Sequence, residues 1–159
     1  MKKGTLHIIF NSVLPGADVS SDFLTFLELW ELWAKPPIGD RRFRRPEPLA
    51  EEDSWEGERD FHEEMPRCYQ LSVVPGFHMG QEDCLFLNVY TPVGNKELLP
   101  VMVYLHGGGF VAGEGSSTMF GPHFFMDEGV LLVTVQYRIG IFGFLSTGGP
   151  WERRFVGPA

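Results

Sequence analysis

A run of three glycines directly after a short apolar segment is the feature that most constrains this chain. Residues 101–105 (Val-Met-Val-Tyr-Leu) suit a pleated surface and follow Pro100, so they predict a strand. Gly107, Gly108 and Gly109 follow His106. Each glycine loses about 0.5–1 kcal/mol relative to alanine when its backbone becomes ordered. The run therefore indicates a loop whose bare backbone N–H groups must come close to another chemical group.

Three interpretations of this loop are open. Residues 107–112 fit the G-x-G-x-x-A form of a dinucleotide fingerprint. Gly113, Gly115 and Pro122 interrupt the helix that this fingerprint requires, and no acidic residue ends the next predicted strand. A simple connecting turn is the second interpretation. The third is an oxyanion hole, because His-Gly-Gly-Gly after a strand is typical of esterases and lipases.

Composition bounds the class of protein. The chain has 159 residues, 43% of them hydrophobic, which predicts one globular domain or a piece of a larger one. Its net charge of −8 disfavours a general nucleic-acid binder. The longest apolar run, Val130–Val135, is too short to span a membrane. We expect no cofactor and no metal.

The two cysteines, Cys68 and Cys84, lack the clustering of a zinc site. Spacing alone leaves two alternatives, a pair of buried free thiols or a disulfide. In the chain-entropy model a disulfide here stabilises the fold by about 3 kcal/mol.

Helical spacing of aromatic and leucine residues predicts an amphipathic helix over Asp22–Trp33. The apolar residues before it make only a poor signal peptide. Residues 68–80 are expected to form a loop that turns at Pro75-Gly76, and residues 81–90 a strand.

The second half predicts one or two helical turns within residues 119–128. The continuously apolar residues 129–135 predict a strand covered on both faces. A strand, a short helix and a second strand indicate an α/β fold with a right-handed crossover.

Five segments together resemble the type-B carboxylesterase family, which includes cholinesterases and insect esterases. They are Ala34-Lys-Pro-Pro-Ile-Gly39, Arg42-Phe-Arg-Arg-Pro-Glu-Pro48, Glu82-Asp-Cys-Leu-Phe-Leu-Asn-Val-Tyr90, His106-Gly-Gly-Gly-Phe110 and Tyr137-Arg-Ile-Gly-Ile-Phe-Gly-Phe-Leu-Ser146. The resemblance covers residues 34–148. It implies the N-terminal portion of an α/β-hydrolase fold, with a mixed, mostly parallel sheet, and a small carboxylic ester as substrate. Together with the cysteine pair it suggests a secretory-pathway protein.

The resemblance also implies roles for particular residues. Gly108 and Gly109 match the family's oxyanion-hole donors, and Gly107 shapes their turn. Cys68 and Cys84 match a family disulfide. Arg42 and Glu82 match a structural ion pair, whose loss would be costly if the pair is partly buried. His106 is a residue of the motif and not the catalytic base.

The departures from the family pattern concern the chain ends and the nucleophile. Residues 28–33 replace a family strand, and residues 149–159 leave the pattern. No G-x-S-x-G motif is present, so Ser116, Ser117 and Ser146 lack the context of a nucleophile. His62, His78 and His123 have no recognisable partner serine. We therefore expect residues 1–33 to be unassigned, residues 149–159 to be an unrelated tail, and the chain to derive from a truncated transcript or faulty gene model.

Three functions compete. The first is a segment of a serine carboxylesterase that is inactive alone, because nucleophile, acid and base are missing. The second is a piece of a non-catalytic, cholinesterase-like adhesion protein. The third is a product too incomplete to fold. Retention of all three glycines favours the enzyme.

Overall fold

The glycine run lies in the connection between two parallel strands. The computed structural model describes residues 26–50, 53, 65–71, 78–92 and 98–146. Strand β5 (Val101–Leu105) pairs in parallel with β6 (Leu131–Val135), and helix α1 (His123–Asp127) lies in the connection between them. The two strands and the short helix predicted for this region are confirmed.

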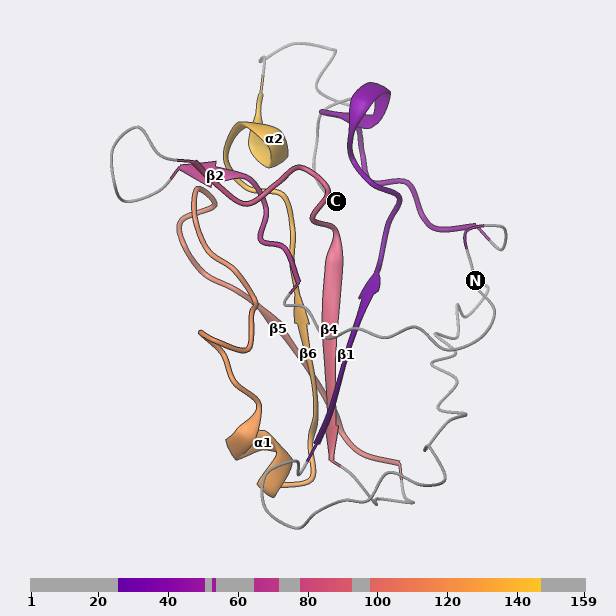
Figure 1. The fold of residues 1–159 in the computed structure, drawn as a ribbon, viewed down its shortest axis with the longest axis vertical. Coiled ribbons are helices and arrows are strands. Elements are labelled where there is room, and N and C mark those ends of the chain that lie inside the picture. Colours follow the sequence, from indigo (N-terminus) through magenta and orange to yellow (C-terminus); the bar gives the residue numbers. More distant parts are fainter. Residues whose placement is uncertain (1–25, 51–52, 54–64, 72–77, 93–97, 147–159) are drawn as a thin grey trace.

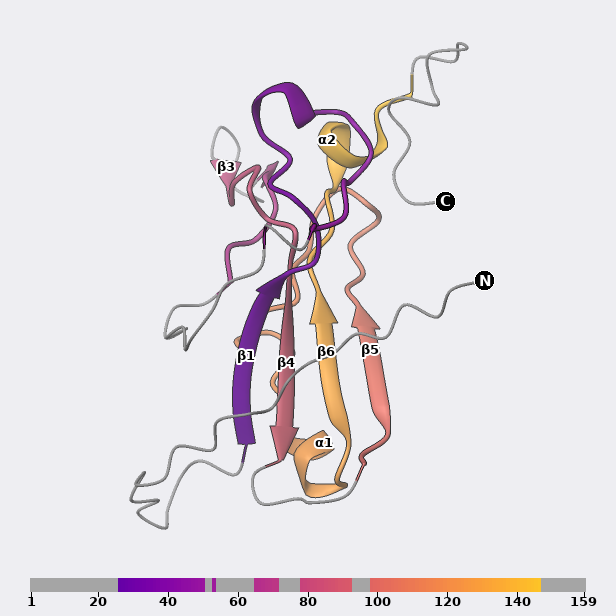
Figure 2. The ribbon, with the colours of Figure 1, turned by 90° about the vertical axis from the view of Figure 1, so that its right-hand side faces the viewer.

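The main sheet has the strand order β1-β4-β6-β5. Figure 2 shows these four strands side by side in that order. β1 (Phe26–Leu32) is antiparallel to β4 (Phe86–Pro92), and β4 is antiparallel to β6. The sheet is mixed, as expected, although antiparallel pairs outnumber the parallel pair among the described strands.

The prediction of a helix over Asp22–Trp33 is wrong where the structure describes it. β1 pairs with β4 along its whole length, from Phe26 opposite Pro92 to Leu32 opposite Phe86. Leucine and tryptophan also fit a pleated surface, and pairing with β4 satisfies the backbone polar groups. Long-range pairing therefore overrides the local helical spacing. Residues 22–25 lie outside the described residues.

The strand predicted over residues 81–90 begins later and ends later than expected, at Phe86 and Pro92. Gln81 forms instead an isolated parallel bridge with Cys68. The loop expected over residues 68–80 contains a short antiparallel pair, β2 (Gln70–Leu71) and β3 (His78–Met79). The expected turn at Pro75-Gly76 lies outside the described residues.

β6 is not covered on both faces, which corrects a second expectation. Leu132 and Thr134 are buried, whereas the alternate residues of β6 are half-buried. β6 lies inside the sheet and β5 lies at its edge in the part of the chain that the structure describes. The side chains of Val101, Val103 and Leu105 on β5 are about 60% exposed. Among the described strands, β5 is therefore an edge strand with exposed apolar side chains.

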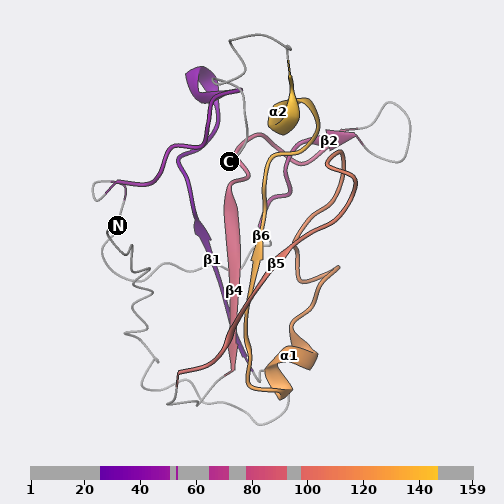
Figure 3. The ribbon, with the colours of Figure 1, turned by 180° about the vertical axis from the view of Figure 1, so that it is seen from behind.

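The remaining short elements lie beyond the ends of the sheet. Helix α2 (Gly140–Phe144) lies beyond the carboxyl end of β6, and α1 lies at the opposite end (Figures 1 and 3). The 3₁₀ turn η1 (Gly39–Arg41) lies at the same end as α2 (Figure 1). Because parallel strands place their carboxyl ends together, the glycine loop after β5 and the segment after β6 meet at this end. Among the described residues, no helix is long and apolar enough to cross a membrane.

Candidate functional site

The glycine loop leaves the carboxyl end of β5 with its backbone exposed. Gly107, Gly108 and Gly109 are all exposed to solvent. The carbonyl of Gly108 accepts hydrogen bonds from the N–H groups of Val111 and Ala112, both at 3.2 Å. No acceptor among the described residues binds the N–H groups of Gly108 and Gly109. The two hydrogen bonds to the Gly108 carbonyl therefore close the loop, and the N–H groups of Gly108 and Gly109 are left without an acceptor among the described residues.

Of the three glycines in the run, Gly108 is the one at which any side chain would clash with the backbone. Its φ is +123°, and a Cβ there would overlap the carbonyl oxygen of Ala112. Gly109 also has a left-handed backbone, with a φ of +62°, but a Cβ there would meet no atom within 4 Å. A Cβ on Gly107 would likewise meet open space. The shape of the turn depends on the close approach at Gly108.

His106 is buried beneath the start of the loop. Its imidazole stacks on the ring of Tyr137, with centroids 4.3 Å apart and planes 15° apart. Its Nδ1 lies 2.9 Å from the carbonyl oxygen of Gly107, so Nδ1–H donates to that carbonyl. The Nε2 atom is buried, and no described residue binds it. The imidazole is therefore buried, stacked on Tyr137 and hydrogen-bonded to the loop.

Phe110 ties the loop to α2. It has a left-handed backbone with a φ of +64°, which is unusual for a residue that is not glycine. Its carbonyl accepts a 2.6 Å hydrogen bond from the N–H of Gly140, and its ring lies 4.8 Å from that of Phe144. The segment after β6 therefore holds the middle of the loop.

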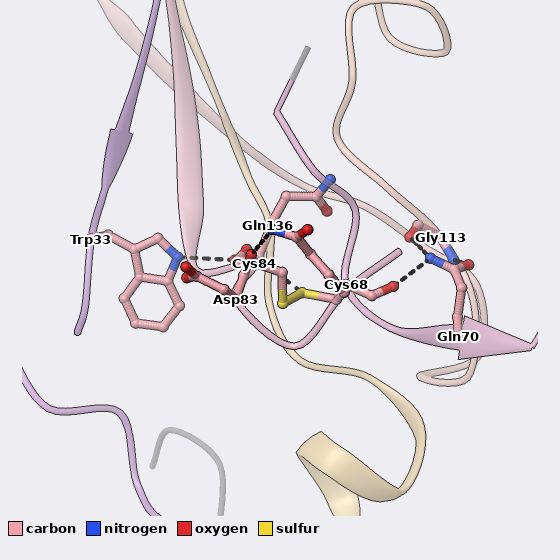
Figure 4. The surroundings of a disulfide bond; sticks show 8 residues. Trp33, Cys68, Gln70, Asp83, Cys84, Gly113 and Gln136 are labelled. Carbon is pink, nitrogen blue, oxygen red and sulfur yellow. Dashed lines mark hydrogen bonds between the residues drawn. A yellow bond between two sulfur atoms is a disulfide. The ribbon is translucent and has the colours of Figure 1, made fainter. Parts of the chain in front are cut away.

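The disulfide between Cys68 and Cys84 is present. The S–S distance is 2.02 Å, the Cα atoms are 4.9 Å apart, and both residues are buried (Figure 4). They form a small core cluster with Ala34, Leu85 and Ile139. The disulfide therefore joins the segment before β2 to the segment before β4, inside a packed core.

Arg42 and Glu82 lie together in a two-pronged ion pair. Arg42 Nε lies 2.5 Å from Glu82 Oε2, and the second guanidinium nitrogen lies 2.7 Å from Oε1. The hydrogen bond to Glu82 and its charge raise the pKa of Arg42 further above its ordinary value. The Arg42 side chain is 47% exposed and the Glu82 side chain is 23% exposed, so the carboxylate is half-buried while the guanidinium faces solvent. Solvent at the guanidinium screens the attraction, which makes this pair less costly to break than a fully buried one.

The serines and the remaining histidines that the structure describes lie outside the glycine loop. Ser116 is buried, with no hydrogen-bond partner for its Oγ among the described residues. Ser146 is exposed beyond α2. His78 stacks on Tyr69 at 5.3 Å, and His123 is exposed at the start of α1. His62 lies outside the described residues.

Two side chains that hold the loop were not singled out by sequence. Tyr137 belongs to a segment that resembles the family, but its role depends on a contact with His106, at the end of the neighbouring strand. Gln70 lies in a segment expected to be a plain loop, and it binds Gly113, 43 residues further along the chain. No local pattern carries a signal for such a pair.

Comparison with known proteins gives consistent matches. The sequence profile of the carboxylesterase family matches residues 32–152. The chain is 43% identical over 143 residues to juvenile hormone esterase of Tribolium castaneum, covering 87% of this chain and 24% of the relative. It is 39% identical over 137 residues to liver carboxylesterase 1 of Oryctolagus cuniculus, covering 76% of this chain and 23% of that protein. The chain thus spans about a quarter of the length of the curated relatives it matches.

Solved structures of esterases also match this chain. Juvenile hormone esterase from Manduca sexta, with OTFP covalently attached, superposes with a TM-score of 0.65 at 34% identity. That match covers 76% of this chain and 24% of the solved one. The Geobacillus stearothermophilus carboxylesterase EST55 gives a TM-score of 0.62 at 35% identity, covering 78% and 25%.

Proposed function

Because this chain belongs to the carboxylesterase family and has part of its α/β-hydrolase fold, we propose that it is a segment of a serine carboxylesterase that carries the oxyanion-hole loop. The backbone N–H groups of Gly108 and Gly109 are the donors. The substrate is a small carboxylic ester, whose carbonyl oxygen would lie against these two glycines.

One observation carries the proposal: two exposed N–H groups without acceptors among the described residues, at the carboxyl end of a parallel strand. When a nucleophile attacks an ester carbonyl carbon, the carbonyl oxygen gains a full negative charge. Donors that are already oriented stabilise that charge without reorganising, and each one lowers the barrier by about 2.7–4 kcal/mol. The bond from His106 Nδ1–H to the Gly107 carbonyl helps to hold the start of the loop.

The 159 residues alone are proposed to be inactive. They contain no G-x-S-x-G motif, and Ser116 is buried. His106 is held by its stack on Tyr137 and by its bond to Gly107, so it cannot act as base. Attack, acyl-enzyme formation and hydrolysis therefore need a nucleophile, base and acid from other sequence.

A fusion tests the proposal. Residues 32–146 replace the matching segment of the Tribolium castaneum esterase, and hydrolysis of a short-chain aryl ester is measured. The fusion should hydrolyse the ester and be inactivated stoichiometrically by an organophosphate, whereas the 159-residue chain should do neither. Activity in the 159-residue chain, or none in a folded fusion, would contradict the proposal.

A matched pair of variants isolates the loop. Gly109 and Gly129 have similar backbones, with φ of +62° and +66°, and a Cβ on either meets no atom within 4 Å. Gly129 lies between α1 and β6, at the end of the sheet away from the loop. Gly109→Ala should lower kcat of the fusion by about 10²-fold or more, by displacing the donors. Gly129→Ala should cost similar stability and leave kcat unchanged. Equal kcat values for the two variants would overturn the assignment of the glycines.

A further inference from the structure

The side-chain amide of Gln70 binds the backbone of Gly113 at both of its polar groups. Gln70 Nε2 donates to the Gly113 carbonyl at 2.9 Å, and the Gly113 N–H donates to Gln70 Oε1, also at 2.9 Å. Nε2 also donates to the carbonyl of Cys68 at 3.1 Å. Gln70 is only 6% exposed, so water competes little for these bonds. Figure 4 shows the amide beside Gly113, with a hydrogen bond back to Cys68.

Gly113 is where the glycine loop closes. Its φ is +129°, and a Cβ there would overlap both the carbonyl oxygen of Gly107 and the ring of His106. The preceding residue, Ala112, has its carbonyl directly against the Cα of Gly108. The backbone of Gly113 thus packs on the first residues of the loop, and a displacement of Gly113 is transmitted to Gly107 and Gly108.

We infer that Gln70 is a positioning residue for the loop: its amide clamps Gly113 and thereby fixes the direction of the N–H groups of Gly108 and Gly109. The catalytic part of this inference rests on the proposed function. The geometric part does not, because it concerns the loop alone. Gln70 follows the disulfide-bonded Cys68 by two residues, so its side chain belongs to a segment that the disulfide cross-links.

The geometric part is tested by amide hydrogen exchange on the full 159-residue chain. Gln70→Met keeps the length of the side chain and removes both hydrogen bonds to Gly113. Exchange of the N–H groups of Val111, Ala112 and Gly113 should then accelerate about tenfold, while amides of β6 keep their rates. Unchanged loop rates, or equal acceleration throughout the sheet, would overturn the inference.

Gln81→Met is the matched control. Gln81 lies on the segment joined to Cys68 by a bridge, and its exposed amide donates to the carbonyl of Asp83 at 2.8 Å and to no other described residue. This variant should leave the exchange of the loop amides unchanged.

Gln70→Glu separates clamping from packing. A protonated carboxyl group has one donor and one acceptor and can bind Gly113 as the amide does, whereas the carboxylate has no donor. Protection of the loop amides in this variant, corrected for intrinsic exchange, should therefore increase as the pH falls. The increase should be larger than in the native chain, where Asp83 alone is expected to make stability depend on pH. A flat profile in Gln70→Glu would contradict the clamp.

The catalytic part is tested in the fusion described above. Oxyanion donors act on the transition state, so Gln70→Met should lower kcat about tenfold and leave KM within twofold. Gln81→Met should change neither constant. Slower turnover with an equal rise in KM would show general loss of structure and overturn the positioning role. If the native fusion were inactive, the proposed function would fail, and the exchange experiment would still decide whether Gln70 clamps the loop.

Discussion

The hydroxyl of Tyr137 donates a 2.5 Å hydrogen bond to the backbone carbonyl of His106, and the two rings stack face to face. Tyr137 follows β6 and His106 follows β5, so the contact joins the carboxyl ends of the two parallel strands. Burial, with a smaller effect of the nearby Tyr104, raises the pKa of Tyr137 above its ordinary value of 10.0. The phenol therefore stays protonated and able to donate throughout the neutral range.

Tyr137→Phe keeps the stacked ring and removes this hydrogen bond. The free energy of unfolding should fall by about 1 kcal/mol, the usual net contribution of one hydrogen bond. Urea unfolding measures the difference. Tyr104→Phe is the control, because the Tyr104 hydroxyl has no hydrogen-bond partner among the described residues. A loss no larger than that of the control would contradict the role given to Tyr137.

The second prediction concerns the disulfide. Replacing both Cys68 and Cys84 with alanine should lower the free energy of unfolding by about 3 kcal/mol, because the unfolded chain regains the freedom of the closed loop. Urea unfolding with and without reductant is the measurement. Reductant should destabilise the native chain and leave the double variant unchanged. Uptake of an alkylating reagent by the unreduced native chain would disprove the bond.

The ion pair of Arg42 and Glu82 should matter little for stability. Arg42→Met and Glu82→Gln should each shift the melting temperature only slightly, because the guanidinium is exposed and solvent screens the attraction. A double-mutant cycle at low and high salt measures the coupling, which should shrink with salt. A large coupling that is insensitive to salt would contradict this expectation.

Asp83 should make stability depend on pH. Burial raises the pKa of its carboxyl above the ordinary value of 3.8, and its Oδ1 atom has no partner among the described residues. The folded chain then binds this proton more tightly than the unfolded chain does. The stability contributed by this group is full below the unfolded pKa and is lost as the pH rises through the folded pKa.

Asp83→Asn removes this titration. The variant should therefore be more stable than the native chain at neutral pH, and the difference should shrink as the pH falls toward about 4. Urea unfolding at a series of pH values measures it. A difference that grows on acidification would show that the carboxylate is stabilised in the fold.

β5 should make the 159-residue chain self-associate. Its exposed residues Val101, Val103 and Leu105 lie on an edge strand among the described residues. Val103→Lys should raise the fraction of monomer in sedimentation velocity. Met119→Lys, which changes an exposed apolar residue outside the strands, should raise it less. A monomeric native chain would refute the prediction.

Sequence patterns predicted the elements whose local residue preferences match the final structure. They failed where contacts between distant residues determine the secondary structure. The strand over residues 101–105 and the short helix before β6 follow from local apolar runs and breakers. β1 was missed because its aromatic spacing fits a helix, whereas seven pairings with β4 decide its structure. The disulfide came from family resemblance, since spacing alone left two alternatives. The bond from Gln70 to Gly113 spans 43 residues and leaves no local trace.

The insertion of β6 between β4 and β5 has a consequence for synthesis on the ribosome. β4 and β5 are consecutive in sequence but do not pair, so the folded sheet has no hairpin between them that could form as the chain emerges. β5 is made before its partner β6, and the glycine loop is made before Tyr137 and Gly140, which hold it. Closing long loops before any pairing is gained slows folding. An apolar strand therefore leaves the exit tunnel without a partner, and this interval is when a chaperone would have to protect it.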